Sequence, residues 1–452
     1  MNIIIAGCGK IGSAILANLV NEGHNVVVLD KSSAVITDIS NVYDVMGVCG
    51  NAADCETLEE AGIAQAELFV AVTDSDDLNM LSCFFAKRMG AKQTLARIRN
   101  PEYNDSSLRF MKEQLGLSFS INPEFLAAKE LFNILKLPSA VKIETFSSRN
   151  FEMIELRLKP DSVLDGMKLI NMRSKFDAKF LVCAVQRGEE VFIPDGNFEL
   201  KSGDRIGLTA SPTEVHKLFR AMGVLQKQAR SVMILGGSRT AYYLAKMLLN
   251  IGASVKIVEK DRELCRQLCE LLPKAVIING DGAQQEVLLE EGISSVDAFV
   301  SLTGMDEENI LISIFAASQN VPKVISKVNR DELCGMAERL GLDCIVSPKK
   351  IIADVLTRYA RALQNTLGSN IETLYHIMDD KAEVLEFNTN SDLPIFGIPL
   401  KDLPIKENTL IAGIIRDRKT IIPTGNDCIL AGDKVVVLTA NHRLQDLSDI
   451  VK

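Results

Sequence analysis

Glycines near the start of the chain are spaced as in turns that bind phosphate. Gly7, Gly9 and Gly12 follow the β-branched run at residues 3–5, and residues 11–21 have the apolar periodicity of a helix. In a Gly-x-Gly-x-x-Gly turn the first glycine makes the tight turn, the second lets a pyrophosphate approach the backbone, and the third lets the helix pack closely on the strand. The free N–H groups at the start of the helix add a partial positive charge for the phosphate.

An acid follows at the distance that a dinucleotide site requires. Asp30 ends the next apolar run, 18 residues after Gly12, where a carboxylate accepts hydrogen bonds from the ribose of adenosine. Because this carboxylate repels a 2′-phosphate, the pattern favours NAD(H) over NADP(H), although the adjacent Lys31 weakens that exclusion. ATP, ADP and AMP share the free 2′-hydroxyl and stay open as ligands. The alternative is a purely structural βα turn, which the flanking strand and helix and the acid disfavour.

These residues need a parallel sheet to hold them in place. Residues 1–120 alternate apolar strand segments with helical segments, which predicts a doubly wound, Rossmann-type domain of six parallel strands. The polar turn that begins with Thr73 and Asp74 follows the fourth strand, at the edge where such sheets bind ligands. Residues 140–225 then change character, with the alternation and hairpin signals of a small α+β module that has no nucleotide loop.

The whole plan occurs twice. Gly236 and Glu259 follow Gly7 and Asp30 by the same 229 residues, and later landmarks keep this spacing to within one residue. The sequence therefore predicts an α/β chain made by tandem duplication of a Rossmann-like doubly wound domain followed by a small α+β domain. The predicted domains are residues 1–138, 139–226, 227–367 and 368–452.

The two copies differ at the glycine turn. Ser238 stands where the first copy has Gly9, and its Cβ narrows the approach to a pyrophosphate. Ala241 stands for the third glycine, which is an accepted replacement. The neighbouring Arg239 could contact a phosphate itself or lie on the surface. Whether the second cleft binds a nucleotide stays open at this point.

Composition restricts the class of protein. A net charge of −9 and a pI near 5.3 argue against general nucleic-acid binding. No apolar run reaches the length of a membrane span, and the fold uses residues 1–30, so a cytosolic protein without a signal peptide is expected. The ten cysteines contain no Cys-x-x-Cys pair, so reduced core thiols and no metal site are expected.

With this layout in view, the chain resembles over essentially its full length the TrkA family, cytosolic regulators of Trk-type bacterial and archaeal potassium uptake that are built of RCK (also called KTN) domains. The resemblance is carried by the fingerprint 7–12 with Asp30, the turn 72–76, the segment 96–99, and small modules that share Ile-Pro-x-Gly and Gly-Asp sequences. The fingerprint alone is shared with many dehydrogenases. The duplicated order with two small modules is much more specific.

The resemblance implies a non-enzymatic regulatory subunit that binds NAD(H), and ATP, ADP or AMP at the same cleft. The bound nucleotide would change the shape of an RCK ring, which acts on a membrane-embedded, K⁺-translocating partner at the cytoplasmic face of the cell membrane. Arg97 could meet a distal phosphate, or could be a surface arginine at a strand end. The candidate binding residues are Gly7, Cys8, Gly9, Lys10, Ile11, Gly12, Asp30, Asn51, Ala52, Thr73, Asp74, Arg97, Gly236 and Glu259.

The resemblance also implies that RCK units pair through the helix that leaves each Rossmann part, here about 123–137 and 348–367. The apolar faces of these helices suit packing on a partner unit, and burial within the helix's own unit is the alternative. A homo-oligomer, a dimer or a tetramer, is expected. The competing hypothesis is an NAD-dependent dehydrogenase, but the small modules offer no histidine or lysine beside a substrate pocket for acid–base chemistry.

Overall fold

The computed structural model describes residues 1–101, 103, 105–146, 151–160, 162–225, 227–365, 371–378, 381–389, 393–417, 419–440, 444 and 446–452. The expected domain boundaries at residue 226 and at 367/368, and the expected end of the second linking helix at residue 367, lie outside these residues. In the part of the chain that is described, no helix combines the length and the apolar character needed to cross a membrane.

The first sheet is parallel, with strand order β3-β2-β1-β4-β5-β6. Its strands are β1 Asn2–Ala6, β2 Asn25–Asp30, β3 Met46–Cys49, β4 Leu68–Ala71, β5 Gln93–Arg97 and β6 Phe119–Ile121. Its helices are α1 Lys10–Asn21, α2 Ser33–Val42, α3 Cys55–Glu60, α4 Asp76–Arg88 and α5 Asp105–Leu115. The direction in which strands are added to the sheet reverses between β1 and β4. The carboxyl ends of these two strands therefore frame a crevice, as predicted for a doubly wound sheet.

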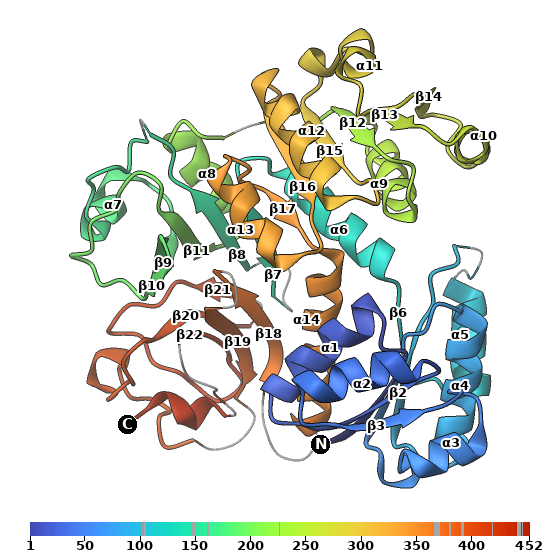
Figure 1. Ribbon diagram of the computed structural model, residues 1–452. Helices are drawn as coiled ribbons and strands as arrows, with labels where there is room; N and C mark the ends of the chain where they lie inside the picture. The colour runs from blue at the N-terminus through green and yellow to red at the C-terminus, as the bar shows by residue number, and fades with distance from the viewer. Residues whose placement is uncertain are drawn as a thin grey trace.

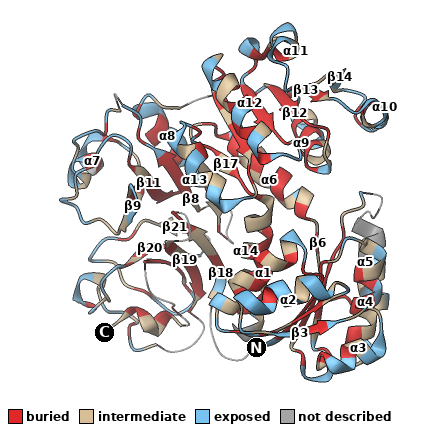
Figure 2. Cartoon of the chain, viewed as in Figure 1, coloured by how far each residue is buried: buried red, intermediate tan, exposed pale blue. Residues whose placement is uncertain are grey.

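The second sheet repeats this topology with the order β14-β13-β12-β15-β16-β17. Its strands are β12 Ser231–Leu235, β13 Ser254–Glu259, β14 Val276–Asn279, β15 Ala298–Ser301, β16 Lys323–Lys327 and β17 Ile345–Val346. Its helices are α9 Arg239–Asn250, α10 Arg262–Leu271, α11 Gln285–Glu290, α12 Asp306–Ser318 and α13 Asp331–Arg339. The central strands of both sheets are buried on both faces, as their β-branched runs predict (Figure 2).

Each small module is an antiparallel sheet, and the two sheets pack on each other. The first contains β7 Lys142–Thr145, β8 Glu152–Arg157, β9 Phe180–Arg187, β10 Glu190–Phe192 and β11 Arg205–Ala210, with helices α7 Leu169–Lys175 and α8 Pro212–Ala221. The second contains β18 Ile371–Ile377, β19 Ala382–Asn388, β20 Thr409–Arg416, β21 Lys419–Ile421 and β22 Lys434–Thr439. One apolar cluster includes Phe151 and Met153 of the first module and Val384 and Val436 of the second. Figure 1 shows the two modules side by side.

The helices that leave the two Rossmann units are exchanged between them. Helix α6 (Pro123–Lys136) follows the first sheet but packs on α9 of the second unit, and its Leu131 and Ile134 share a core with Leu244 and Leu248. Helix α14 (Pro348–Asn365) follows the second sheet but packs on α1 of the first unit (Figure 1). The two exchanged helices also contact each other. Packing on a partner unit therefore occurs within one chain.

Candidate functional site

The three glycines of the first turn have different structural roles. Gly7 has φ +95°, and a Cβ added there would lie 2.7 Å from the backbone nitrogen of Thr73. A Cβ added to Gly12 would lie 1.9 Å from the carbonyl oxygen of Gly7, so this glycine allows α1 to pack against the turn. A Cβ added to Gly9 would have no neighbour within 4 Å. Protein packing does not require a glycine at position 9, and the open space there leaves the backbone of the turn accessible.

Asp30 is held at the end of β2 by backbone donors. Its carboxylate accepts hydrogen bonds from the N–H of Cys8 at 2.7 Å and from the N–H of Ser32 at 2.9 Å. Burial, together with the nearby Asp30 charge, raises the pKa of the Cys8 thiol to about 12. Cys8 is therefore an unreactive thiol behind the turn, and the Asp30 carboxylate stays in a fixed orientation at the turn.

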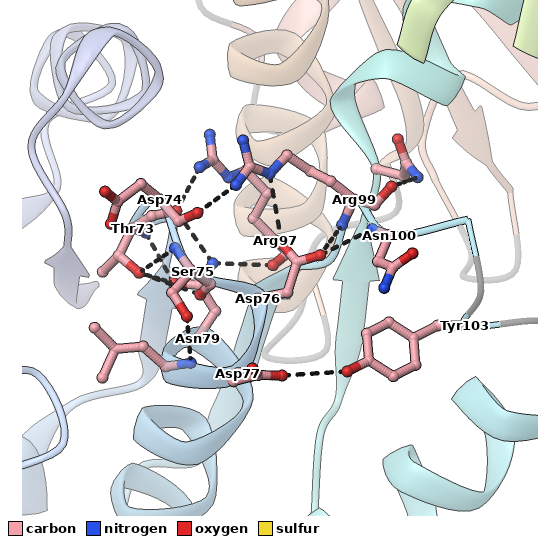
Figure 3. Close-up of polar contacts among 12 residues, drawn as sticks. Thr73, Asp74, Ser75, Asp76, Asp77, Asn79, Arg97, Arg99, Asn100 and Tyr103 are labelled. Carbon is pink, nitrogen blue, oxygen red and sulfur yellow. Dashed lines mark hydrogen bonds and ion pairs between the residues drawn. The ribbon is translucent and has the colours of Figure 1, made fainter. Parts of the chain in front are cut away.

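A hydrogen-bond network shapes the turn after β4 (Figure 3). The side-chain oxygen of Asn79 accepts from the backbone N–H of Thr73 at 2.8 Å and from its hydroxyl at 2.7 Å. The amide of Asn79 donates to the carbonyl of Arg97 at 3.0 Å, and the guanidinium of Arg97 donates to the carbonyl of Thr73. Asn79 thereby joins the ends of β4 and β5, and this role of Asn79 was not expected from the sequence.

Arg97 is not the surface arginine that the sequence left open. It is only 8% exposed, its Nε has no hydrogen-bond partner, and burial lowers its pKa. Arg99, two residues further on, instead donates to the carbonyl of Asp74 and pairs with Asp76, Nε to Oδ1, at 3.5 Å. Arg97 is the last residue of β5, whereas Arg99 lies beyond the end of this strand, so the strand does not fix the direction of the Arg99 side chain.

One cavity of about 1010 Å³ lies over this turn and the strand ends. Of the candidate residues, it is lined by Gly7, Gly9, Lys10, Ile11, Asp30, Asn51, Ala52, Thr73, Asp74 and Arg97. The other four candidates do not line it. Cys8 is buried behind the turn, Gly12 is used in packing α1, and Gly236 and Glu259 belong to the second cleft.

The opposite wall of the cavity comes from the second Rossmann unit. Arg239, at the start of α9, and Lys327, at the end of β16, line it together with Lys349 at the start of α14. Burial lowers the pKa of Lys327, nearby Asp306 opposes this shift, and nearby Lys10 adds to it.

The repeat contains a signal for this second wall. Arg239 is the repeat equivalent of Lys10, and Lys327 is the equivalent of Arg97, at offsets of 229 and 230 residues. Both members of each cationic pair line the same cavity. The sequence identified Arg239 as a possible phosphate contact but not the facing of the two units, so Lys327 and Lys349 were missed.

The second cleft keeps the acid but changes the space around it. Glu259 accepts hydrogen bonds from the N–H of Gly237 at 2.6 Å and of Asp261 at 2.8 Å, as Asp30 does in the first unit. The residue equivalent to Ala6 is Leu235, whose Cδ1 lies 2.1 Å from where a Cβ on Gly282 would be. Leu235, which is larger than Ala6, therefore fills the space that Gly282, which is smaller than its equivalent Ala52, leaves open.

Ser238 in this cleft is turned toward its own helix. Its hydroxyl accepts a hydrogen bond from the N–H of Ala241 at 3.4 Å and caps α9. The same residue also lines the large cavity of the first unit. Whether the second cleft binds a ligand stays open.

Among the described residues, Glu22, His376 and Glu383 are close enough together to hold a metal ion. Arg361 already occupies this group, because it binds Glu22 in a bidentate pair at 2.5 and 2.6 Å and Glu383 at 3.1 Å. A guanidinium between the carboxylates supplies the positive charge that a metal would bring. The arrangement favours an ion-pair network that joins α14 to α1 and to β19.

Comparison with known proteins fits this geometry. The model of the TrkA-N domain family matches residues 3–123 and 232–348, and that of the TrkA-C domain family matches residues 153–223 and 384–452. The chain belongs to the TrkA family. It is 31% identical to a "Trk system potassium uptake protein TrkA homolog" of Archaeoglobus fulgidus over 100% of both chains. It is 28% identical to the "Trk system potassium uptake protein TrkA" of Haemophilus influenzae, over 99% of this chain and 96% of that one.

Solved structures of RCK proteins share the fold of this TrkA-family chain. The GsuK RCK domain aligns with a TM-score of 0.64 at 15% identity, covering 97% of this chain and 92% of that one. The GsuK channel bound to NAD aligns with a TM-score of 0.62 at 14% identity, covering 97% and 77%. The expected fold, tandem Rossmann-like units with small antiparallel modules, is confirmed.

Proposed function

We propose that this TrkA-family chain is a nucleotide-sensing regulatory subunit of a Trk-type potassium uptake system. It binds NAD(H), or ATP, ADP or AMP, in the first Rossmann cleft and gates a membrane-embedded K⁺-translocating partner from the cytoplasmic side. The observation that carries the proposal is the large cavity, which combines the first glycine turn, the Asp30 carboxylate and cationic side chains of the second unit. The names of the homologous Trk potassium uptake proteins support the choice of partner.

In this proposal, different residues of the cavity contact the ribose, the adenine and the phosphates of the nucleotide. Asp30 retains acceptor capacity beyond its two backbone donors and suits the ribose, with Asn51 and Ala52 lining the wall near the adenine. Gly9 leaves the turn open to phosphate. Lys10 and Arg239 offer positive charge to phosphates from both sides. Structures of the related GsuK are described as bound to NAD and to ADP.

Such a ligand would act on the whole molecule because its site has walls from both units. The cavity is lined by the starts of α6 and α14, through Pro123 and Pro348, as well as by both glycine turns. A ligand that bridges these walls stabilises one relative placement of the units over others. Helices α6 and α14 precede the two small modules in the chain, so a preferred placement of the Rossmann units also changes the placement of the small modules. We propose a homo-oligomer, dimer or tetramer, as the assembly that carries it to the membrane partner.

Calorimetric titration of the full chain with NADH, NADPH, ATP and ADP tests the proposal, repeated on Asp30→Ala and on Glu259→Ala. Binding of NADH or ATP that is lost in Asp30→Ala, with NADPH weak throughout, is the expected result. Glu259→Ala is the matched control, because it removes the equivalent acid from the other cleft. If Glu259→Ala removes further nucleotide-binding sites, the second cleft binds nucleotide as well.

Two outcomes would contradict the proposal. One is the absence of binding of any of the four nucleotides. The other is steady oxidation of NADH with a metabolite, which would favour the dehydrogenase hypothesis. No histidine of the described chain lines the cavity, so the acid–base group that a dehydrogenase needs would have to be a lysine or a carboxylate.

A further inference from the structure

A second, smaller cavity of about 160 Å³ lies where the exchanged helices meet the small modules. Glu130 of α6 lines it, facing Lys142 and Glu144 of β7 and Asp354 and Arg358 of α14. The cavity is small and charged, so it suits protons and water rather than an organic ligand. We call it the junction chamber.

The other charged groups in the junction chamber already have partners. Lys142 pairs with Glu144 at 3.1 Å and donates to the carbonyl of His376 at 2.8 Å. Glu155 of β8 pairs with Arg205 of β11 at 2.6 Å. Within the described part of the chain, no hydrogen bond or ion pair holds the carboxylate of Glu130.

His376 adds a cation at one side of the chamber. Burial opposes its charge, but hydrogen bonds with Asp354 and Glu383 raise its pKa to about 9. The imidazole is therefore held positive by two carboxylates, each at 3.5 Å. Glu338 of α13, Asp343 and Lys350 also line the chamber.

Glu130 is thus left as the carboxyl whose charge is least compensated. Burial raises the pKa of Glu130 to about 7. The negative charges of Glu144 and Asp354 add to this increase, and the positive charges of Lys142 and Arg358 oppose it. An ordinary glutamate ionises well below neutral pH.

The helices that form the chamber also form the nucleotide cavity. Pro123 and Glu124 at the start of α6 line the nucleotide cavity, and Glu130 lies about two turns further along the same helix. Pro348 and Lys349 at the start of α14 line that cavity too, and Asp354 lies between one and two turns along. A charge placed in the chamber acts on the same two helices that a nucleotide contacts.

We propose that the junction chamber is a proton-responsive joint, in which Glu130 takes up a proton and thereby tightens the packing of α6 and α14 against the small modules. The unprotonated carboxylate faces Glu144 and Asp354 and loosens this packing. Proton uptake thereby favours one relative placement of the two units. Its effect on nucleotide affinity rests on the function proposed above, whereas its effect on stability does not.

The decisive experiment compares the melting temperature of the full chain with that of Glu130→Gln across pH 5 to 8. The proton is bound more strongly by the folded chain than by the unfolded chain, so ionisation of Glu130 lowers stability as pH rises from about 4.5 toward about 7. Glutamine imitates the protonated form. We therefore expect a higher melting temperature for Glu130→Gln than for the wild type at pH 8, and a much smaller difference at pH 5.

The opposite result would show a different role. If Glu130→Gln melts at a lower temperature than the wild type at pH 8, Glu130 is an ordinary ion-pair partner of Lys142 and the proposal is wrong. Equal melting temperatures of the two proteins at every pH would also overturn it. Glu60→Gln, which removes an exposed carboxylate, is the matched control and should leave the pH profile unchanged. Glu144→Gln should move the midpoint of the wild-type pH effect downward, because one of the charges that raise the pKa of Glu130 is gone.

A second readout measures NADH affinity at pH 6 and pH 8 by calorimetry. We expect the wild-type affinity to differ between these pH values by several-fold and the affinity of Glu130→Gln not to differ. A pH dependence that persists unchanged in Glu130→Gln would overturn the coupling. If NADH does not bind at either pH, the function proposed above fails, and the melting comparison still decides whether Glu130 is the proton site.

Discussion

Two glycines of one fingerprint illustrate how a residue's environment decides what its substitution does. Gly9 is the N-cap of α1 with φ −68°, a conformation that any residue adopts, and open space surrounds the position of a Cβ. Gly12 is closed in by the carbonyl of Gly7. Protein packing requires a glycine at position 12 and leaves the space beside position 9 open.

Substituting the two glycines separates binding from stability. Gly9→Ala should weaken NADH or ATP binding by about tenfold or more, while the melting temperature stays nearly constant, because the new methyl group projects only toward the ligand. Gly12→Ala should lower the free energy of unfolding by about 1–3 kcal/mol through overpacking. Calorimetry and denaturant unfolding of both variants check this, and a large stability loss in Gly9→Ala would contradict it.

Arg239 tests whether the second unit contributes to the first cleft. Its guanidinium is exposed and lines the cavity opposite the first glycine turn. Arg239→Gln should weaken ATP and ADP binding by about tenfold, since one charge-assisted contact to phosphate is lost, and should leave adenosine binding unchanged. Arg266→Gln on α10 is the control for a lost surface arginine of the same unit. Equal effects on adenosine and ATP would argue against a phosphate contact.

At the scale of elements, α14 is the link between the large cavity and the second small module. Its first turn lines the cavity, its middle lines the junction chamber, and Arg361 near its end binds Glu22 and Glu383. The Arg361 and Glu22 side chains are only 8% and 13% exposed. An ion pair this far from water positions the helix strongly, because a charge left without its partner is costly there.

Arg361→Gln should therefore lower the free energy of unfolding by about 3 kcal/mol, since it leaves Glu22 without its counterion. Arg339→Gln, which removes an exposed arginine at the end of α13, should change it by less than about 0.5 kcal/mol. The double variant Glu22→Gln with Arg361→Gln should lose less than the sum of the single variants. Additive losses in denaturant unfolding would show that the pair is not coupled.

At the scale of the molecule, the exchange of α6 and α14 makes each Rossmann unit incomplete without the other. Helix α14 covers Ile15, Leu16 and Leu19 of the first unit. Helix α6 covers Leu244 and Leu248 of the second. Separate halves would expose these faces, which are too large and apolar to be left in water.

A chain divided between residues 226 and 227 should accordingly reassemble. The two halves, produced together, are expected to form a one-to-one complex in size-exclusion chromatography, and each half alone should self-associate or fail to melt cooperatively. Reassembly is favoured because it restores the same buried apolar surface. Two monomeric halves that each melt cooperatively would contradict the importance of the exchange.

The sequence by itself was sufficient to predict the units and much of the first half-site. Gly7, Gly9 and Asp30 were recognisable because strand, turn and helix signals act over a few residues. The repeat offset then identified Gly236 and Glu259 as the equivalents of Gly7 and Asp30. The family resemblance added Asn51, Ala52 and Arg97, which the structure brings to the same cavity. That these residues bind a nucleotide stays a prediction.

Only the tertiary structure decided which surfaces face each other. An amphipathic helix such as α6 shows in its sequence that one face is buried, but not which apolar partner covers it, because hydrophobic burial has no direction. The same limit hid Lys327 and Lys349 in the cavity wall and Glu130 in the junction chamber. Several of the charged neighbours of Glu130 and Lys327, such as Asp354 and Lys10, lie more than two hundred positions away in the chain.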